Sequence, residues 1–161
     1  MPTDISGPDG WPIELDFRSV LAPEQPSDER FTYAPWVRAL RGKSGVYLIK
    51  ADPEQFRDEL LYIGECHTAT ARHSLYNTLT RHFHRKGSWK EGVMYSPADV
   101  VVAVIETAVD MAIPYQDALI GLNQPRDNQL ALELRGFVMQ THEEQEPEQP
   151  DQDQEEEEIP F

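Results

Sequence analysis

The stretch SGVYLIKADPEQFRDELLYIGEC, residues 44–66, decides the fold of this chain. It contains two runs rich in apolar, aromatic and β-branched residues, 45–50 and 60–64, and that composition favours an extended backbone in each. The segment between the runs is polar and contains Pro53, so it predicts a hairpin connection. The two runs are therefore expected to pair in antiparallel fashion, with Tyr47 and Tyr62 on neighbouring strands.

The tripeptides GVY at 45–47 and YIG at 62–64 resemble the signature of the GIY-YIG nuclease family. The elements expected after them are a helix over 71–85 with Thr70 as its N-cap, a strand over 99–106, and a helix from Pro114 to about 123. The β-branched continuity of 99–106 suggests a strand buried on both faces. A small three-stranded sheet flanked by helices, an α/β (α+β) fold, satisfies this order, and the resembling family has the same order.

The flanking regions differ in composition from this central part. Residues 1–39 are expected to be an arm, extended and Pro-containing up to 30 and packing through Trp11, Ile13, Leu15 and Phe17, then a short helix or turn over 31–42. The GIY-YIG-like domain is placed at 40–140, with one more short element possible at 129–140. Residues 141–161 are acidic and of low complexity, so they are expected to form a disordered tail.

The resemblance implies a site for phosphodiester hydrolysis. In the family two tyrosines hold or activate the attacking water, and Tyr47 and Tyr62 occupy their places; the alternative is that both tyrosines fill the core. Arg72 stands where the family carries a phosphate-binding helix arginine. Tyr76 stands at the place of a histidine or tyrosine, and Asn128 at that of a supporting asparagine.

Two arginines compete for the phosphate-binding role. A helix over 71–85 would put Arg72 on the same face as Leu75 and Leu79, where a guanidinium group needs an anionic partner such as a phosphate. An alternative alignment, anchored on the residues RHF, selects Arg81, which such a helix would turn towards solvent or the DNA backbone. The sequence favours Arg72.

The family glutamate is where this chain departs from the pattern. The segment QDALIGLNQPRDN aligns well with the family, but it places Gln116 at the position of the metal-binding glutamate. Mg²⁺ or Mn²⁺ would be the cofactor of an active enzyme, and such hard cations prefer carboxylate oxygen to a neutral amide. Asp117 is about 100° around the helix, and Glu106 is a more open possibility. The sequence leaves open whether Gln116 is natural or an introduced inactivating substitution.

Charge is distributed unevenly along the chain. The formal net charge is −15, but residues 141–161 contain ten acids and no Lys or Arg, and without them 19 acids face 14 Lys and Arg, a net of −5. Residues 66–90 contain no Asp or Glu. This local basicity predicts a DNA-binding surface. Its expected members are Arg81, His82, Arg85, Lys86 and Lys90.

Other classes of protein are less well supported. A zinc site is one interpretation of the residues Cys66, His67, His73, His82 and His84. Their spacing, however, matches no compact pair of zinc ligands with a second pair elsewhere in the chain. Solvated residues on a DNA-facing helix account better for them. A single cysteine suits a reducing cytoplasm, and the longest apolar run, 100–105, predicts a strand and no membrane span.

The last residues, DQDQEEEEIPF, resemble the C-terminal tip of bacterial single-stranded DNA-binding proteins. That resemblance implies that Ile159, Pro160 and Phe161 dock on bacterial replication and repair proteins. The favoured expectation is a GIY-YIG-like DNA endonuclease, impaired if Gln116 holds the glutamate position, whose tail recruits such partners. One alternative is a non-catalytic DNA-binding or interaction protein that competes for these partners. Another is a structural protein without DNA affinity, but the absence of Asp and Glu from residues 66–90 argues against it.

Overall fold

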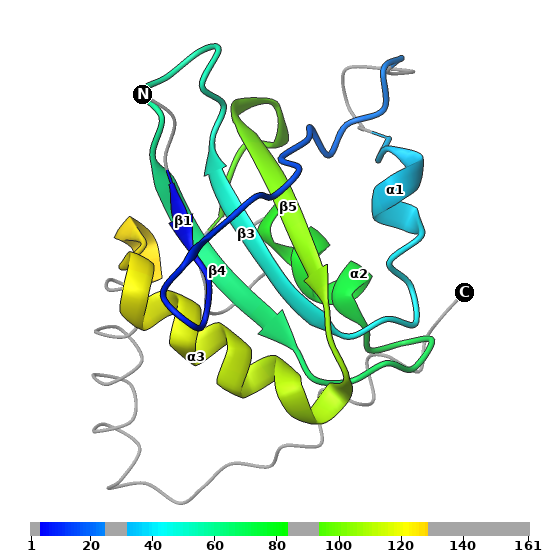
Figure 1. Ribbon diagram of the computed structural model, residues 1–161. Coiled ribbons are helices and arrows are strands. Elements are labelled where there is room, and N and C mark those ends of the chain that lie inside the picture. The colour runs from blue at the N-terminus through cyan, green and yellow to red at the C-terminus, as the bar shows by residue number, and fades with distance from the viewer. Residues whose placement is uncertain (1–3, 25–31, 84–93, 129–161) are drawn as a thin grey trace, which may run out of the picture. The chain divides into compact units, whose positions relative to one another are not determined.

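A three-stranded antiparallel sheet lies at the centre of this computed structural model, which describes residues 4–24, 32–83 and 94–128 (Figure 1). The described residues all belong to one compact unit, which includes the N-terminal segment. The elements in chain order are β1 (Ile5–Ser6), β2 (Pro12–Ile13), α1 (Pro35–Arg38), β3 (Gly45–Ala51), β4 (Leu60–Cys66), α2 (Leu75–Thr80), the 3₁₀ turns η1 (Arg81–Phe83) and η2 (Pro97–Asp99), β5 (Val100–Glu106), the 3₁₀ turn η3 (Val109–Met111), and α3 (Ala112–Asn123).

The predicted hairpin is confirmed as the antiparallel pair β3–β4, and β5 pairs with the other side of β3. The strand order is β4-β3-β5, so the GVY strand is central and every residue of β3 is buried. A register shift at Ile49/Lys50 adds a residue to β4. Because of this bulge, Leu61 and Tyr62 pack with the same core cluster.

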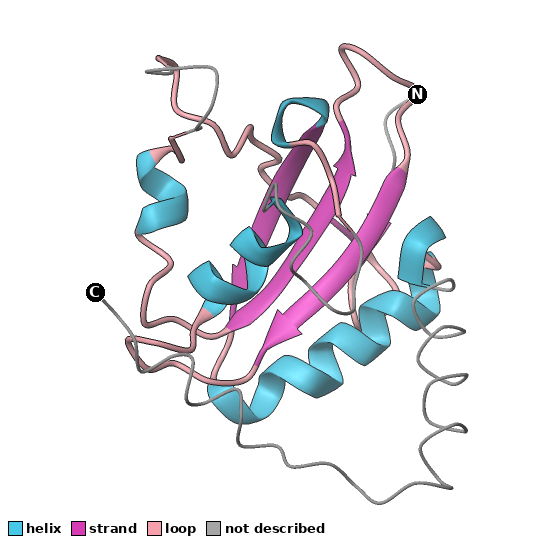
Figure 2. Ribbon diagram, turned by 180° about the vertical axis from the view of Figure 1, so that it is seen from behind, coloured by secondary structure: helices cyan, strands magenta, loops and turns pink. Residues whose placement is uncertain are grey.

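The sheet separates two apolar clusters. One contains Tyr47, Ile49 and the α2 residues Leu75 and Leu79, and Figure 2 shows α2 lying across this face. The other contains Val46, Leu48 and Ile63 together with Leu119 of α3 and residues of the N-terminal segment. A mixed α+β architecture with a three-stranded sheet and helices on both faces therefore agrees with the sequence prediction.

The N-terminal segment departs in part from expectation. It forms the short β1–β2 hairpin, and Ile13, Leu15 and Phe17 pack on the α3 side of the sheet as predicted. Trp11 does not: 71% of its surface is exposed, and the large apolar side chain that the hairpin buries is Ile5. The backbone of Arg18 also exchanges hydrogen bonds with Val102, which covers part of the open edge of β5.

Helix α2 begins later than the sequence predicts. Its N-cap is Ser74, whose backbone N–H donates to the side chain of Asn77 at 3.1 Å. Thr70 instead accepts a hydrogen bond from the backbone N–H of His73, a local turn that competes with helix formation. Leu75 and Leu79 still form the buried face, as does Phe83 in η1.

The later elements lie close to their predicted places. Helix α3 starts two residues before the predicted Pro114, which therefore sits in its first turn. The prediction that this strand is buried on both faces is correct only in part. Val101, Val104 and Ile105 of β5 are half-exposed, since β5 lies at the edge of the described sheet. No described helix is long and apolar enough to cross a membrane. The element predicted at 129–140, the tail at 141–161, and His84, Arg85, Lys86 and Lys90 lie outside the described residues.

Candidate phosphodiester site

Both glycines of the paired tripeptides stand where a side chain would collide with a neighbour. Tyr47 and Gly64 are directly opposite each other in the β3–β4 register. A Cβ on Gly64 would overlap the ring and hydroxyl of Tyr47, so the ring lies directly over this glycine. Gly45 has φ of +154°, and a Cβ there would overlap the carbonyl of Ile105 on β5. The two tripeptides thus form one packed unit, with glycine providing room for tyrosine.

Tyr47, Tyr62 and His82 form a compact group that we call the tyrosine–histidine cluster. The Tyr47 hydroxyl and Nε2 of His82 are 2.8 Å apart and share a hydrogen bond. The ring centroid of Tyr62 is 4.9 Å from that of His82 and 6.3 Å from that of Tyr47. Tyr47 and His82 are buried, whereas Tyr62 is half-buried. The expectation that His82 is solvated is therefore wrong: the turn η1 directs it into the cluster.

The electrostatic environment keeps Tyr47 protonated. Burial raises the pKa of Tyr47 well above its usual value, and the neighbouring Tyr62 raises it further. The positive charge of Arg81 acts in the opposite direction and lowers that pKa. Tyr47 is therefore a neutral phenol at ordinary pH. The positive charge of Arg81 is close enough to affect the pKa of Tyr47.

The structure favours Arg81 over Arg72 as the arginine of the candidate site. Arg72 lies in the loop before α2 and is exposed, so the expectation that it points from a helix towards the sheet is wrong. Arg81 is the exposed first residue of η1, next to His82. Tyr76 has the Arg41 guanidinium 3.9 Å over its ring and an edge contact with Tyr33. Of the two candidates, Arg81, which the alternative alignment selects, is thus the one whose charge acts on Tyr47.

Asn128 braces the YIG strand from its outer edge. Its Oδ1 accepts a hydrogen bond from the backbone N–H of Ile63 at 2.8 Å, and its Nδ2 donates to the carbonyl of the same residue at 2.9 Å. Ile63 lies between Tyr62 and Gly64 on β4, an outer strand of the sheet. The supporting position assigned to Asn128 from the sequence is therefore next to the cluster.

A polar network adjoining the cluster was missed by the sequence analysis. The backbone N–H of Tyr95 donates to the carbonyl of His82, and the Tyr95 hydroxyl donates to Asp127 at 2.7 Å. Arg126 donates to both carboxylate oxygens of Asp127. Burial and the hydrogen bond to Asp127 raise the pKa of Tyr95. The run RDN at 126–128 was a signal for this network, but only its asparagine was interpreted.

The described residues do not fit a magnesium site. Gln116 is half-buried on α3, whose apolar residues pack on the face of the sheet opposite α2, and its neutral amide forms no hydrogen bond within the described residues. Asp127 already binds Arg126 and Tyr95, and Glu106 pairs with Lys43 at 3.5 Å. No three His, Cys, Asp or Glu of 4–24, 32–83 and 94–128 lie together as metal ligands would.

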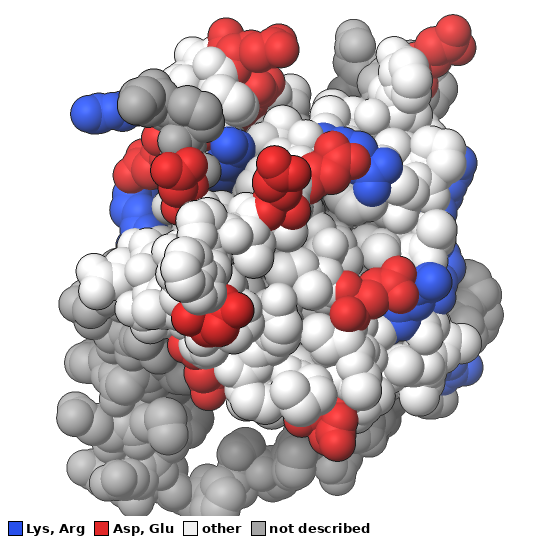
Figure 3. Space-filling model, in the orientation of Figure 1, with Lys and Arg blue, Asp and Glu red and all other residues white. Residues whose placement is uncertain are grey.

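Comparisons with protein-family models, curated proteins and solved structures found no match for this chain. The likeness to the GIY-YIG family therefore rests on the residues GVY, YIG and Asn128 and on the way they pack. The face that carries α3 shows acidic side chains with Lys and Arg among them (Figure 3). The cluster instead packs on the α2 side of the sheet.

Proposed function

We propose that this chain is a GIY-YIG-like DNA-binding domain that holds a phosphodiester at the tyrosine–histidine cluster and hydrolyses it poorly with Gln116 in place. The observation that carries the proposal is the Tyr47–His82 hydrogen bond beneath the half-buried Tyr62. Phosphodiester cleavage needs a positioned water and a stabilised phosphate charge. A phenol, an imidazole and a neighbouring guanidinium are groups that meet those needs.

The cluster residues divide the work according to their exposure. Tyr47 is buried and fixes the orientation of His82 through its hydroxyl. Tyr62 is half-buried, so its hydroxyl is the better placed of the two to meet a water molecule or a phosphate oxygen. Arg81 is exposed, and its positive charge acts on Tyr47. Because the described residues do not fit a divalent cation, the metal-dependent activity of the resembling family is expected to be weak here.

The DNA-binding part is tested by fluorescence anisotropy with a labelled duplex over a range of salt concentrations. Arg81→Gln should weaken binding and make the salt dependence shallower by about one released counterion. Arg38→Gln makes the same change of charge on α1 and is the matched control, since Arg38 is also exposed. Equal losses in the two variants would mean that only overall charge matters and would contradict a phosphate site at the cluster.

A non-catalytic DNA-binding or interaction protein is the second candidate, and Gln116 is the observation that favours it. Ile159, Pro160 and Phe161, which lie outside the described residues, support recruitment of bacterial replication or repair proteins because their sequence resembles the tip named above. Phe161→Ala should abolish binding of the full chain to a purified repair protein that binds such tips. Unchanged affinity would contradict a role of these three residues in binding repair proteins.

A further inference from the structure

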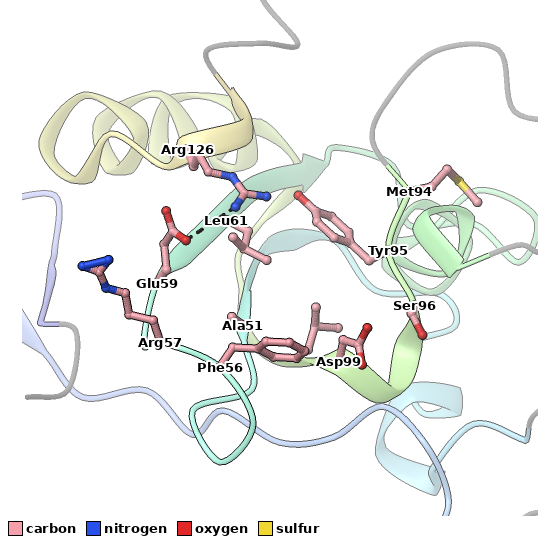
Figure 4. A pocket seen from close by; sticks show the side chains of 11 residues that line it. Ala51, Phe56, Arg57, Glu59, Leu61, Met94, Tyr95, Ser96, Asp99 and Arg126 are labelled. Carbon is pink, nitrogen blue, oxygen red and sulfur yellow. Dashed lines mark hydrogen bonds and ion pairs between the residues drawn. The ribbon is translucent and has the colours of Figure 1, made fainter.

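A cavity of about 450 Å³ is lined by residues of the sheet and by Tyr95 (Figure 4). Its floor is apolar and is formed by Ala51, Leu61 and Val100 from the three strands of the sheet. Two aromatic rings, Phe56 and Tyr95, stand on its walls. A flat apolar ligand with two exposed faces matches such a lining.

The rim of the cavity is polar and balanced in charge. Arg57 and Arg126 contribute two cations, and Glu59 and Asp99 contribute two carboxylates. Arg126 is already engaged by Asp127 at 2.8 Å and by Glu59 at 3.5 Å. Within the described part of the chain, the Asp99 carboxylate accepts no hydrogen bond. Such a rim suits a neutral ligand with N–H donors better than a free phosphate, which both carboxylates would repel.

The cavity and the cluster share structure. Tyr95 lines the cavity, its ring centroid is 6.0 Å from that of His82, and its N–H bonds the His82 carbonyl. Leu61 of the floor directly precedes Tyr62, and the bulge of β4 brings both to the same face. A ligand group in the cavity would therefore lie next to a phosphate held at the cluster.

We propose that this cavity binds a single unpaired nucleobase of the DNA strand whose phosphate is held at the cluster. The proposal rests on the proposed function and names its substrate class: DNA with a base outside the helix. A base in the cavity stacks on Phe56 and donates to Asp99 from its Watson–Crick edge. Guanine is the best match because that edge carries two adjacent donors, whereas thymine presents one donor between two acceptors.

The test compares two labelled duplexes that differ only by one bulged guanine, with the full chain in the presence of a chelator. The bulged duplex should bind about tenfold more tightly, since base–aromatic stacking contributes on that order and a bulged base costs little to extrude. Phe56→Ala should abolish the preference and leave the affinity for paired DNA unchanged. Phe56 is 49% exposed, so its truncation spares the core.

Trp11→Ala is the matched control, because it removes an exposed aromatic residue from the N-terminal hairpin and should keep the preference. Asp99→Asn should equalise bulged guanine and bulged thymine. Equal affinity for bulged and paired duplexes, or a preference that survives Phe56→Ala, would overturn the proposal. If paired DNA binds in an Arg81-dependent manner without a base preference, this inference alone fails. If neither duplex binds, it fails together with the proposed function.

Discussion

Gly64 faces the ring of Tyr47 across the β3–β4 ladder, and that contact sets the geometry of the tyrosine–histidine cluster. The outer part of the ring occupies the space that a side chain at Gly64 would need, and the Tyr47 hydroxyl lies 2.8 Å from Nε2 of His82. Replacement of Gly64 by any other residue forces the ring to move. The glycine of YIG is thus required by the tyrosine of GVY.

Gly64→Ala should therefore destabilise the fold by about 1–3 kcal/mol, the usual range for an overpacked core. Gly121→Ala is the control: its Cβ would meet nothing within 4 Å on α3, and it should stabilise the helix by about 0.5–1 kcal/mol. Urea unfolding followed by circular dichroism measures both. A stable Gly64→Ala variant that retains DNA binding would contradict this role of the glycine.

At the scale of the elements, two asparagines at and after the end of α3 each form a pair of hydrogen bonds with the backbone of an outer strand. Asn123 accepts from the N–H of Ser6 on β1 and donates to its carbonyl, at 2.8 and 2.9 Å. Asn128 does the same to Ile63 on β4. Each side-chain amide therefore takes the place of a neighbouring strand and satisfies the N–H and the carbonyl of one residue at a strand edge. Only the strand that Asn128 contacts contains the YIG residues.

Asn128→Ala should cost about 2–4 kcal/mol of stability, because two buried backbone groups of Ile63 lose their partners. It should also weaken DNA binding, since Tyr62 and Gly64 flank the released residue. Asn123→Ala is the matched variant and should destabilise the fold while leaving the DNA affinity of the folded protein intact. Stability is read from urea unfolding and affinity from anisotropy; indistinguishable DNA affinities for the two variants would disprove a specific role of Asn128.

The elements also show what the sequence was able to predict. The β3–β4 pair, β5 and α3 follow from apolar runs and Pro114, because long-range packing reinforces those local signals. The start of α2 did not follow, because Thr70 and Ser74 are both good caps and the choice depends on local hydrogen bonds. The burial of His82 and the bonds of Asp127 depend on which turns meet in space, and no sequence period encodes that.

At the scale of the whole molecule, tyrosine burial makes stability depend on alkaline pH. Burial raises the pKa values of Tyr33, Tyr47 and Tyr95 above the ordinary value of 10.0. Above about pH 10 the unfolded chain loses these protons while the folded chain keeps them, so the unfolded state binds fewer protons and stability falls as pH rises.

The urea midpoint should therefore not change with pH near pH 8 through ionisation of these tyrosines, and it should decrease between pH 10 and pH 11, where unfolded tyrosines ionise. The Tyr47→Phe variant should be less stable at pH 8, because the Tyr47–His82 hydrogen bond is lost, but should show a smaller decrease at high pH. An equal decrease in the variant and the original chain would mean that Tyr47 ionises normally in the folded protein.

The central claim is that Tyr47, Tyr62 and His82 form a phosphodiester site, and that Gln116 stands at the position of the acidic residue of the resembling family. Nicking of supercoiled plasmid in Mg²⁺ by Gln116→Glu, alone and combined with Tyr62→Phe or Tyr115→Phe, tests it most directly. The account predicts very weak nicking by the original chain and clear nicking by Gln116→Glu. Tyr62→Phe should abolish that nicking, and Tyr115→Phe, which removes the hydroxyl of a tyrosine outside the tyrosine–histidine cluster, should not. Absence of nicking by a Gln116→Glu variant that binds DNA normally, or nicking that survives Tyr62→Phe, would contradict it.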